Sequence, residues 1–441
     1  MTQMTQPEPD RAGGPGPSGR GAGSTRRSPS GPARSAKRGK QREPGSLKEQ
    51  VIADSDLHVM EPPDLWQRYI DPAYAHAAPI GLTEIPRDMR VRVKNHTVLR
   101  LGRVRPVQRE GHRTGWRPEH DSVYAAAEQR GWDPVSQIEA MDAEGLDLAV
   151  LFPSRGLFVL GLDSIDMIGP DGLEPEYASA IARAYNDWLA DFCGHAPDRM
   201  YGAAMVAPHD VDGAVAEARR CVDELGFRAI FLAPGCVNRR PWHHPAYDPL
   251  WAEIERLDVP VAFHGGGQTY LRPDFSLEVL DRLMMWHTFN QPLAIQFVTV
   301  CMCAGGVLER FPDLRVALLE GNCSWAPWLL HRLDEHHEWT GWYEATDLSL
   351  KPSEYFRRNC YVSLEADEAT AIHYVDWFGA DNLVFSTDYP HGDSQYPHAV
   401  EELERLDLPH EVKVRIVGEN WARLYKVPLA KKAGRDRIRR R

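Results

Sequence analysis

Cysteine is scarce in this sequence, and long apolar runs are absent from it. Only seven cysteines occur in 441 residues, and none of them is in a C-x-x-C spacing. This argues against a disulfide framework and a thiolate zinc site, and it favours a reducing, cytoplasmic location. No run of about 18 apolar residues is present, so we expect no membrane-spanning helix. The start of the chain also lacks the apolar region of a secretory signal.

Charge is distributed unevenly along the chain. Residues 1–48 hold ten basic and three acidic residues, and because the net charge of the whole chain is −12, the remainder carries about −19. The segment 1–48 is rich in Gly, Pro, Ser and Arg and has little to bury, so we predict a disordered basic tail. The acidic body argues against nucleic acid as a partner. We expect one catalytic domain at 49–428 and a second basic tail at 429–441.

From Val51 onward, short β-rich runs alternate with amphipathic helical patterns. Most runs are almost continuously apolar, which is typical of parallel strands covered on both faces. Eight strand–helix repeats predict a (β/α)8 TIM barrel; the alternative is a doubly wound sheet, but no G-x-G-x-x-G follows a strand. Residues 70–133 are too long for an ordinary connection and are predicted to form an insertion or lid. The predicted strands are 51–57, 147–152, 200–206, 228–233, 259–264, 314–320, 359–365 and 383–388.

Ionisable residues stand at the carboxyl ends of most predicted strands, which is the rim where TIM barrels place active sites. Asp56 and His58 are two residues apart on the first strand, so their side chains point the same way. Acids and imidazoles buried together are costly unless they are paired or metal-bound. Carboxylate and imidazole ligands suit Zn²⁺, Mn²⁺ or Fe²⁺. The other strand ends supply His264, Glu320, Glu365 and Asp388.

Three motifs in the chain resemble a known family. They are D-x-H at 56–58, "AFHGGG" at 262–267 and "STDYPH" at 386–391. They resemble the amidohydrolase-related branch of metal-dependent barrels, which includes aminocarboxymuconate semialdehyde decarboxylase and benzoate-type decarboxylases. The resemblance spans roughly residues 51–425 and implies a divalent metal. The metal ligands that it implies are Asp56, His58, His264 and Asp388.

The end of the sixth strand departs from this family. The decarboxylases place a catalytic His there, whereas this chain has Glu320. A Glu with an ordinary pKa of about 4.3 is anionic at pH 7 and prefers to bind metal. Its charge, added to those of Asp56 and Asp388, is offset better by two metal ions than by one. The predicted catalytic residues are Glu320, Asp388 and His264, and the further candidate ligands are His287, His391, Glu61 and Glu365.

A carboxylate-rich two-metal site without thiolates is similar to that of the barrel-fold nonheme diiron monooxygenases of platensimycin and platencin biosynthesis. This resemblance implies two Fe²⁺ per chain, O₂, an electron donor, and hydroxylation of a hydrophobic, diterpenoid-like acyl-CoA substrate in antibiotic (secondary) metabolism. One alternative is a hydrolase or decarboxylase with a single Zn²⁺ or Mn²⁺ that acts on a small carboxylate. Another is a barrel that binds a ligand without turnover. We also expect a homodimer.

Overall fold

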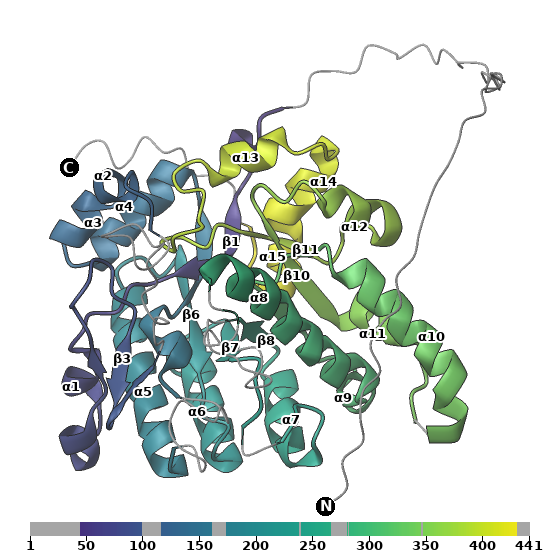
Figure 1. Ribbon diagram of the computed structural model, residues 1–441, viewed down its shortest axis with the longest axis horizontal. Coiled ribbons are helices and arrows are strands. Elements are labelled where there is room, and N and C mark those ends of the chain that lie inside the picture. The colour runs from purple at the N-terminus through teal and green to yellow at the C-terminus, as the bar shows by residue number, and fades with distance from the viewer. Residues whose placement is uncertain are drawn as a thin grey trace, which may run out of the picture. The chain divides into compact units, whose positions relative to one another are not determined.

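Eight parallel strands form a nearly closed barrel in the computed structural model (Figure 1). Each strand pairs with the next one along the chain, and two hydrogen bonds join the first strand to the segment after the last. The N–H of His58 donates to the carbonyl of Tyr389 (2.7 Å), and the N–H of Asp388 donates to the carbonyl of Asp56 (3.1 Å). The predicted TIM barrel is confirmed. The strands are β1 (Ala53–His58), β5 (Leu148–Phe152), β6 (Met200–Met205), β7 (Ala229–Leu232), β8 (Val261–His264), β9 (Val316–Leu319), β10 (Cys360–Glu365) and β11 (Leu383–Ser386).

The structure describes residues 45–98, 116–160, 173–237, 240–265, 280, 282–344 and 347–429. The predicted N-terminal tail therefore lies outside the described residues except for 45–48, and the C-terminal tail lies outside them except for Leu429. Part of the predicted insertion, 99–115, also lies outside them.

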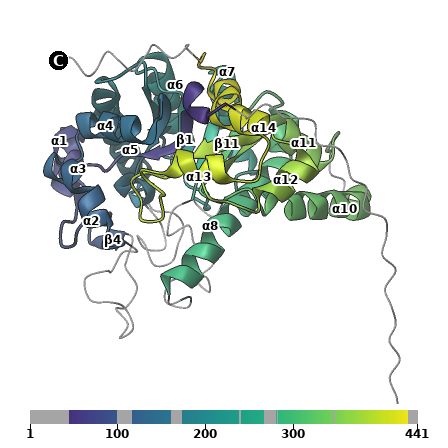
Figure 2. The ribbon, with the colours of Figure 1, turned by 90° about the horizontal axis from the view of Figure 1, so that it is seen from above.

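Helices follow the strands and cover the outside of the barrel (Figures 1 and 2). Local sequence explains why α4 begins and ends where it does: the Asp133 carboxylate accepts the N–H of Ser136, Pro134 occupies the first turn, and Gly145 ends the helix at φ 91°. No helix in the described part of the chain has the length and apolar character needed to cross a bilayer. The helices after β5 are α5 (Pro175–Cys193), α6 (Val211–Asp223), α7 (Asp248–Arg256), α8 (Leu283–Thr299), α9 (Val307–Arg310), α10 (Ala326–Glu344), α11 (Pro352–Asn359), α12 (Ala371–Phe378), α13 (Ala399–Arg405), α14 (His410–Val414) and α15 (Asn420–Tyr425), and α4 (Pro134–Glu144) precedes that strand.

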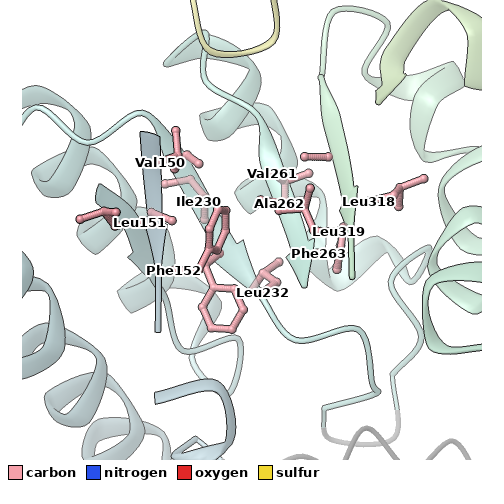
Figure 3. Close-up of a cluster of buried hydrophobic side chains, with 14 of the residues drawn as sticks. Val150, Leu151, Phe152, Ile230, Leu232, Val261, Ala262, Phe263, Leu318 and Leu319 are labelled. Atoms are coloured by element: carbon pink, nitrogen blue, oxygen red, sulfur yellow. The ribbon is translucent and has the colours of Figure 1, made fainter. Parts of the chain in front are cut away.

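Apolar strand residues fill the interior of the barrel and the layer between its strands and helices. Phe152, Phe263 and Leu318 are buried, as are their neighbours on adjacent strands (Figure 3). Burying side chains of this size stabilises the fold by about 1.5–3 kcal/mol each before the loss of chain entropy is counted. This packing holds the strand ends in fixed positions, and the site described below is built on those ends.

The segment between β1 and β5 carries structure of its own. It begins with α1 (Leu65–Tyr69) and continues with a small antiparallel sheet of three strands. Arg87 is buried there and forms ion pairs with Asp121 (2.5 Å) and Glu128 (2.7 Å). That the segment acts as a lid stays a prediction. The remaining elements are β2 (Ile80–Gly81), β3 (Val91–Val93), β4 (His96–Val98), α2 (His120–Val123) and α3 (Ala125–Gln129).

Candidate metal centre

Three side chains converge at the carboxyl ends of β1 and β8. Asp56 Oδ1 lies 2.7 Å from His264 Nε2 and 3.3 Å from His58 Nε2, and all three residues are fully buried. Both carboxylate oxygens of Asp56 and both of these nitrogens have no hydrogen-bond partner among the described residues. Buried polar atoms without partners are costly. Their donor types and mutual proximity fit a divalent cation.

Backbone carbonyls fix the orientation of both imidazoles. His58 Nδ1 lies 2.8 Å from the carbonyl of Pro153, and His264 Nδ1 lies 2.5 Å from the carbonyl of Gly265. Because a carbonyl only accepts, each Nδ1 carries a hydrogen, and each Nε2 is the ring nitrogen that faces the centre. Metal-binding histidines are commonly held in this way. Gly265 leaves room for this arrangement, since an added Cβ would lie 2.9 Å from Gln291 Oε1.

Asp388 and His391 form a second group beside the first. Asp388 follows β11 in a left-handed conformation, with φ 54°, and its Oδ1 lies 3.2 Å from His58 Nε2. The same oxygen lies 2.8 Å from His391 Nδ1, and His391 Nε2 lies 2.9 Å from Ser154 Oγ. Both ring nitrogens of His391 are therefore engaged. His58, Asp388 and His391 also form a second group of buried ligand atoms close enough to hold a metal ion, so His391 as a ligand stays a prediction.

The pKa values reflect this close packing of charge. Burial alone would raise the pKa of Asp56, but His264 and His58 outweigh it and hold the pKa below its usual value. Burial likewise opposes ionisation of Asp388, but His391 and His58 hold its pKa well below the usual range. Burial acts to lower the pKa of His58, yet Asp388 and Asp56 raise it to about 10. The two aspartates are the anions of the site.

Glu320 lies at the edge of the cluster, beside His264. It follows β9 at φ 59°, its Oε2 lies 3.2 Å from His264 Nδ1, and its Oε1 accepts a hydrogen bond from Gln291 Nε2 (2.6 Å). Burial, with the charges of Asp388 and Asp56, raises its pKa well above the usual value. This raised pKa favours the protonated carboxyl over the carboxylate that the sequence predicts, and the role of Glu320 as a metal ligand stays a prediction.

Glu61 is an anchor for the loop after β5. Its Oε2 accepts the N–H groups of Ser154 (3.2 Å) and Arg155 (2.8 Å), and its Oε1 accepts that of Gly156 (3.0 Å). Both oxygens are thereby used, and the structure does not bring Glu61 into the cluster. We predicted it as a weaker candidate ligand, and its backbone contacts explain its buried position instead.

Two further candidates also lie apart from the cluster. His287 is about one-third exposed, and its Nε2 is 3.8 Å from Glu320 Oε1. Glu365 ends β10, where burial and nearby acids such as Asp393 raise its pKa well above the usual value.

Sequence reasoning missed Ser154, because a single hydroxyl after a strand carries no recognisable signal.

The amidohydrolase family pattern matches residues 53–427. Gamma-resorcylate decarboxylase from Rhodococcus jostii (strain RHA1) is 30% identical over 273 residues, which are 58% of this chain and 79% of that protein. An amidohydrolase structure from Mycobacterium avium subsp. paratuberculosis K-10 has TM-score 0.66 at 20% identity. The match covers 85% of this chain and 99% of that protein. A dihydroxybenzoic acid decarboxylase structure from Polaromonas sp. JS666, with bound manganese and the inhibitor 2-nitroresorcinol, has TM-score 0.59 at 20% identity. The match covers 86% of this chain and 97% of that protein.

These findings overturn the predicted activity and cofactor. The O₂-dependent diiron monooxygenase acting on an acyl-CoA is wrong, because the relatives are decarboxylases. Two Fe²⁺ per chain is also wrong, because structures of decarboxylases with this fold hold manganese. The physical reason lies in the count of anions. The raised pKa of Glu320 opposes its ionisation, and Glu61 accepts backbone N–H groups away from the cluster, so fewer negative charges face the centre than the sequence suggested.

Proposed function

The chain belongs to the amidohydrolase family, and on that premise we propose that it is a metal-dependent decarboxylase of a small aromatic or conjugated carboxylate. One observation carries the proposal. A cluster of unpartnered ligand atoms, from Asp56, His58 and His264, lies beside the Glu320 carboxyl, and burial raises the pKa of that carboxyl well above its usual value. A site that combines cation ligands with a protonated acid suits the replacement of a carboxylate by a proton.

Asp56, His58, His264 and Asp388 would hold one divalent ion, with Mn²⁺ the first candidate. When bound, the ion supplies positive charge that grips the substrate's carboxylate or an adjacent hydroxyl. His58 and His264 are held rigidly by the carbonyls of Pro153 and Gly265, so the ligand atoms need little reorganisation.

Glu320 is the proposed proton donor. Its proton adds to the substrate carbon that carries the carboxylate. The bond between that carbon and the carboxylate then breaks, its electron pair restores the conjugated system, and CO₂ leaves. The resulting Glu320 carboxylate regains a proton from water, so one proton is consumed for each CO₂ released. Gln291 donates to Glu320 Oε1 and keeps the carboxyl directed into the site.

The proposal is tested on the full chain, stripped of metal by a chelator and reloaded with Mn²⁺, Zn²⁺ or Fe²⁺. The substrates are 2,6-dihydroxybenzoate, which is gamma-resorcylate, and a panel of related hydroxybenzoates and conjugated acids. We expect metal-dependent CO₂ release without O₂ consumption. Hydrolysis of esters or amides without CO₂ release, or O₂ uptake coupled to substrate loss, would overturn the proposal.

A further inference from the structure

The segment between β1 and β5 contains a buried tyrosine hydroxyl that makes no hydrogen bond within the described part of the chain. It belongs to Tyr124, which lies between α2 and α3. The backbone of this residue is fully used: its N–H donates to the carbonyl of His120 (3.0 Å), and its carbonyl accepts the N–H of Glu128 (2.9 Å). A buried hydroxyl without a partner is costly, so its position implies a ligand or an ordered water.

Ring contacts place Tyr124 against the segment that carries Asp388. The ring centroid of Tyr124 lies 5.8 Å from that of Tyr389, at an interplanar angle of 60°, and 5.7 Å from that of Tyr396, at 13°. Tyr389 directly follows Asp388, and its carbonyl accepts the N–H of His58. Burial and the charge of Asp388 raise the pKa of the Tyr124 hydroxyl, which therefore stays protonated at neutral pH. The inserted segment thus brings a hydrogen-bond donor to the rim that holds the candidate metal ligands.

Arg87 fixes the two short helices that flank Tyr124. Its buried guanidinium pairs with Asp121 of α2 and Glu128 of α3, and it lies 5.9 Å from the centroid of the Tyr124 ring. A guanidinium near the face of an aromatic ring is attracted to that ring. Because these contacts hold the ring in place, its hydroxyl has little freedom to lose when a ligand binds.

The surroundings of the hydroxyl favour a planar aromatic ligand. Besides the two tyrosines after β11, the ring of Trp132 packs on Tyr124, with the two centroids 5.7 Å apart. Aromatic side chains of this kind offer flat apolar surfaces to a ligand ring, and a single polar group among them recognises one polar substituent.

We propose that Tyr124 is a specificity-determining residue whose hydroxyl donates a hydrogen bond to a ring hydroxyl of an aromatic carboxylate substrate. This inference rests on the proposed function, which supplies the class of substrate. One hydroxyl beside the carboxylate faces the candidate metal ligands, and Tyr124 binds a second hydroxyl on the ring. A ring without that second hydroxyl leaves the tyrosine hydroxyl buried and unpaired, so such a compound binds more weakly.

Binding of two small probes to the full, Mn²⁺-loaded chain tests the proposal without turnover. 2-Nitroresorcinol has a planar nitro group in place of the carboxylate and a hydroxyl on each side of it, whereas 2-nitrophenol has only one of these hydroxyls. Titration calorimetry should show that the wild type binds 2-nitroresorcinol at least about tenfold more tightly than 2-nitrophenol. Tyr124→Phe should bring the two dissociation constants within about threefold of each other, because the group that distinguishes the probes is gone.

Tyr374→Phe on α12 is a matched control. The buried hydroxyl of Tyr374 also lacks a partner among the described residues, but its ring packs on Phe378. The control variant should keep the wild-type preference for 2-nitroresorcinol. Circular dichroism and Mn²⁺ titration establish that both variants are folded and hold metal.

Turnover separates this inference from the proposed function. The ratio of kcat/KM for 2,6-dihydroxybenzoate to that for 2-hydroxybenzoate should fall at least about tenfold in Tyr124→Phe, mainly through KM. If the probes behave as expected but no carboxylate releases CO₂, the proposed function fails and the role of Tyr124 stands.

Three results would overturn the role of Tyr124. The first is a wild type that binds the two probes equally well or binds neither. The second is a Tyr124→Phe variant that keeps the preference for 2-nitroresorcinol, which would assign the hydroxyl to an ordered water. The third is a turnover ratio that Tyr124→Phe leaves unchanged.

Discussion

Ser154 Oγ and His391 Nε2 lie 2.9 Å apart, although 237 positions separate them in the sequence. Through the other ring nitrogen, His391 contacts Asp388, which in turn contacts His58. The loop after β5 also supplies the Pro153 carbonyl that orients His58. One short loop therefore positions two parts of the candidate metal centre.

Removing the Ser154 hydroxyl should loosen Asp388. In Ser154→Ala, His391 Nε2 loses its partner, so the dissociation constant for Mn²⁺ should rise by about tenfold or more. Metal titration of the stripped chain measures this. Ser136→Ala is a matched control, because it removes a buried hydroxyl at the start of α4, where the hydroxyl donates to the backbone carbonyl of Asp133. An equal loss of affinity in both variants would contradict the positioning role.

Replacing Glu61 distinguishes an anchor from a ligand. Glu61→Gln puts an amide nitrogen in place of one oxygen that accepts loop N–H groups, which should lower the free energy of unfolding by about 1–3 kcal/mol. The bound metal per chain, measured at saturating Mn²⁺, should stay the same while the affinity falls. A lower metal count at saturation would show that Glu61 binds metal directly.

Glu320 variants test the proposed proton donor. Glu320→Gln retains a similar shape but carries no acidic proton, so kcat should fall by about 10²–10⁴. Metal content should be unchanged, which separates proton delivery from ligation. Glu320→His is the matched variant, because an imidazole can supply a proton near pH 7, and it should retain more activity than Glu320→Gln. Loss of half or more of the metal in either variant would instead make Glu320 a ligand.

Glu144 should make stability depend on pH. It is buried at the end of α4, its Oε1 accepts the N–H of Val400, and burial raises its pKa from 4.5 to about 7. Between these values the folded chain keeps a proton that the unfolded chain releases. The free energy of unfolding should therefore fall as the pH rises from about 4.5 to 7, by roughly 3 kcal/mol.

Glu144→Gln keeps an oxygen for Val400 and does not titrate. Relative to wild type, the variant should gain stability between pH 5 and pH 8, and denaturant unfolding at each pH measures the gain. Other buried acids contribute equally to both proteins and cancel in the difference. A difference that does not change with pH would show that Glu144 is ionised in the folded chain.

The sequence alone determined the architecture. Almost continuous apolar strands alternating with helices, together with Asp56-x-His58 on the first strand, predicted the barrel and placed the candidate ligands at one rim. These features are local, because strand pattern and the two-residue period depend only on neighbouring residues.

The tertiary structure decided what each acid does. Glu320 and Glu61 look alike in the sequence, yet burial beside Asp388 and Asp56 raises the pKa of the first, and three loop N–H groups occupy the second. The role of Ser154 also depends on a contact between distant segments. The surroundings of a side chain in space set its charge state and its hydrogen-bond partners. The prediction of two metal ions was wrong because it rested on the number of carboxylates in the sequence.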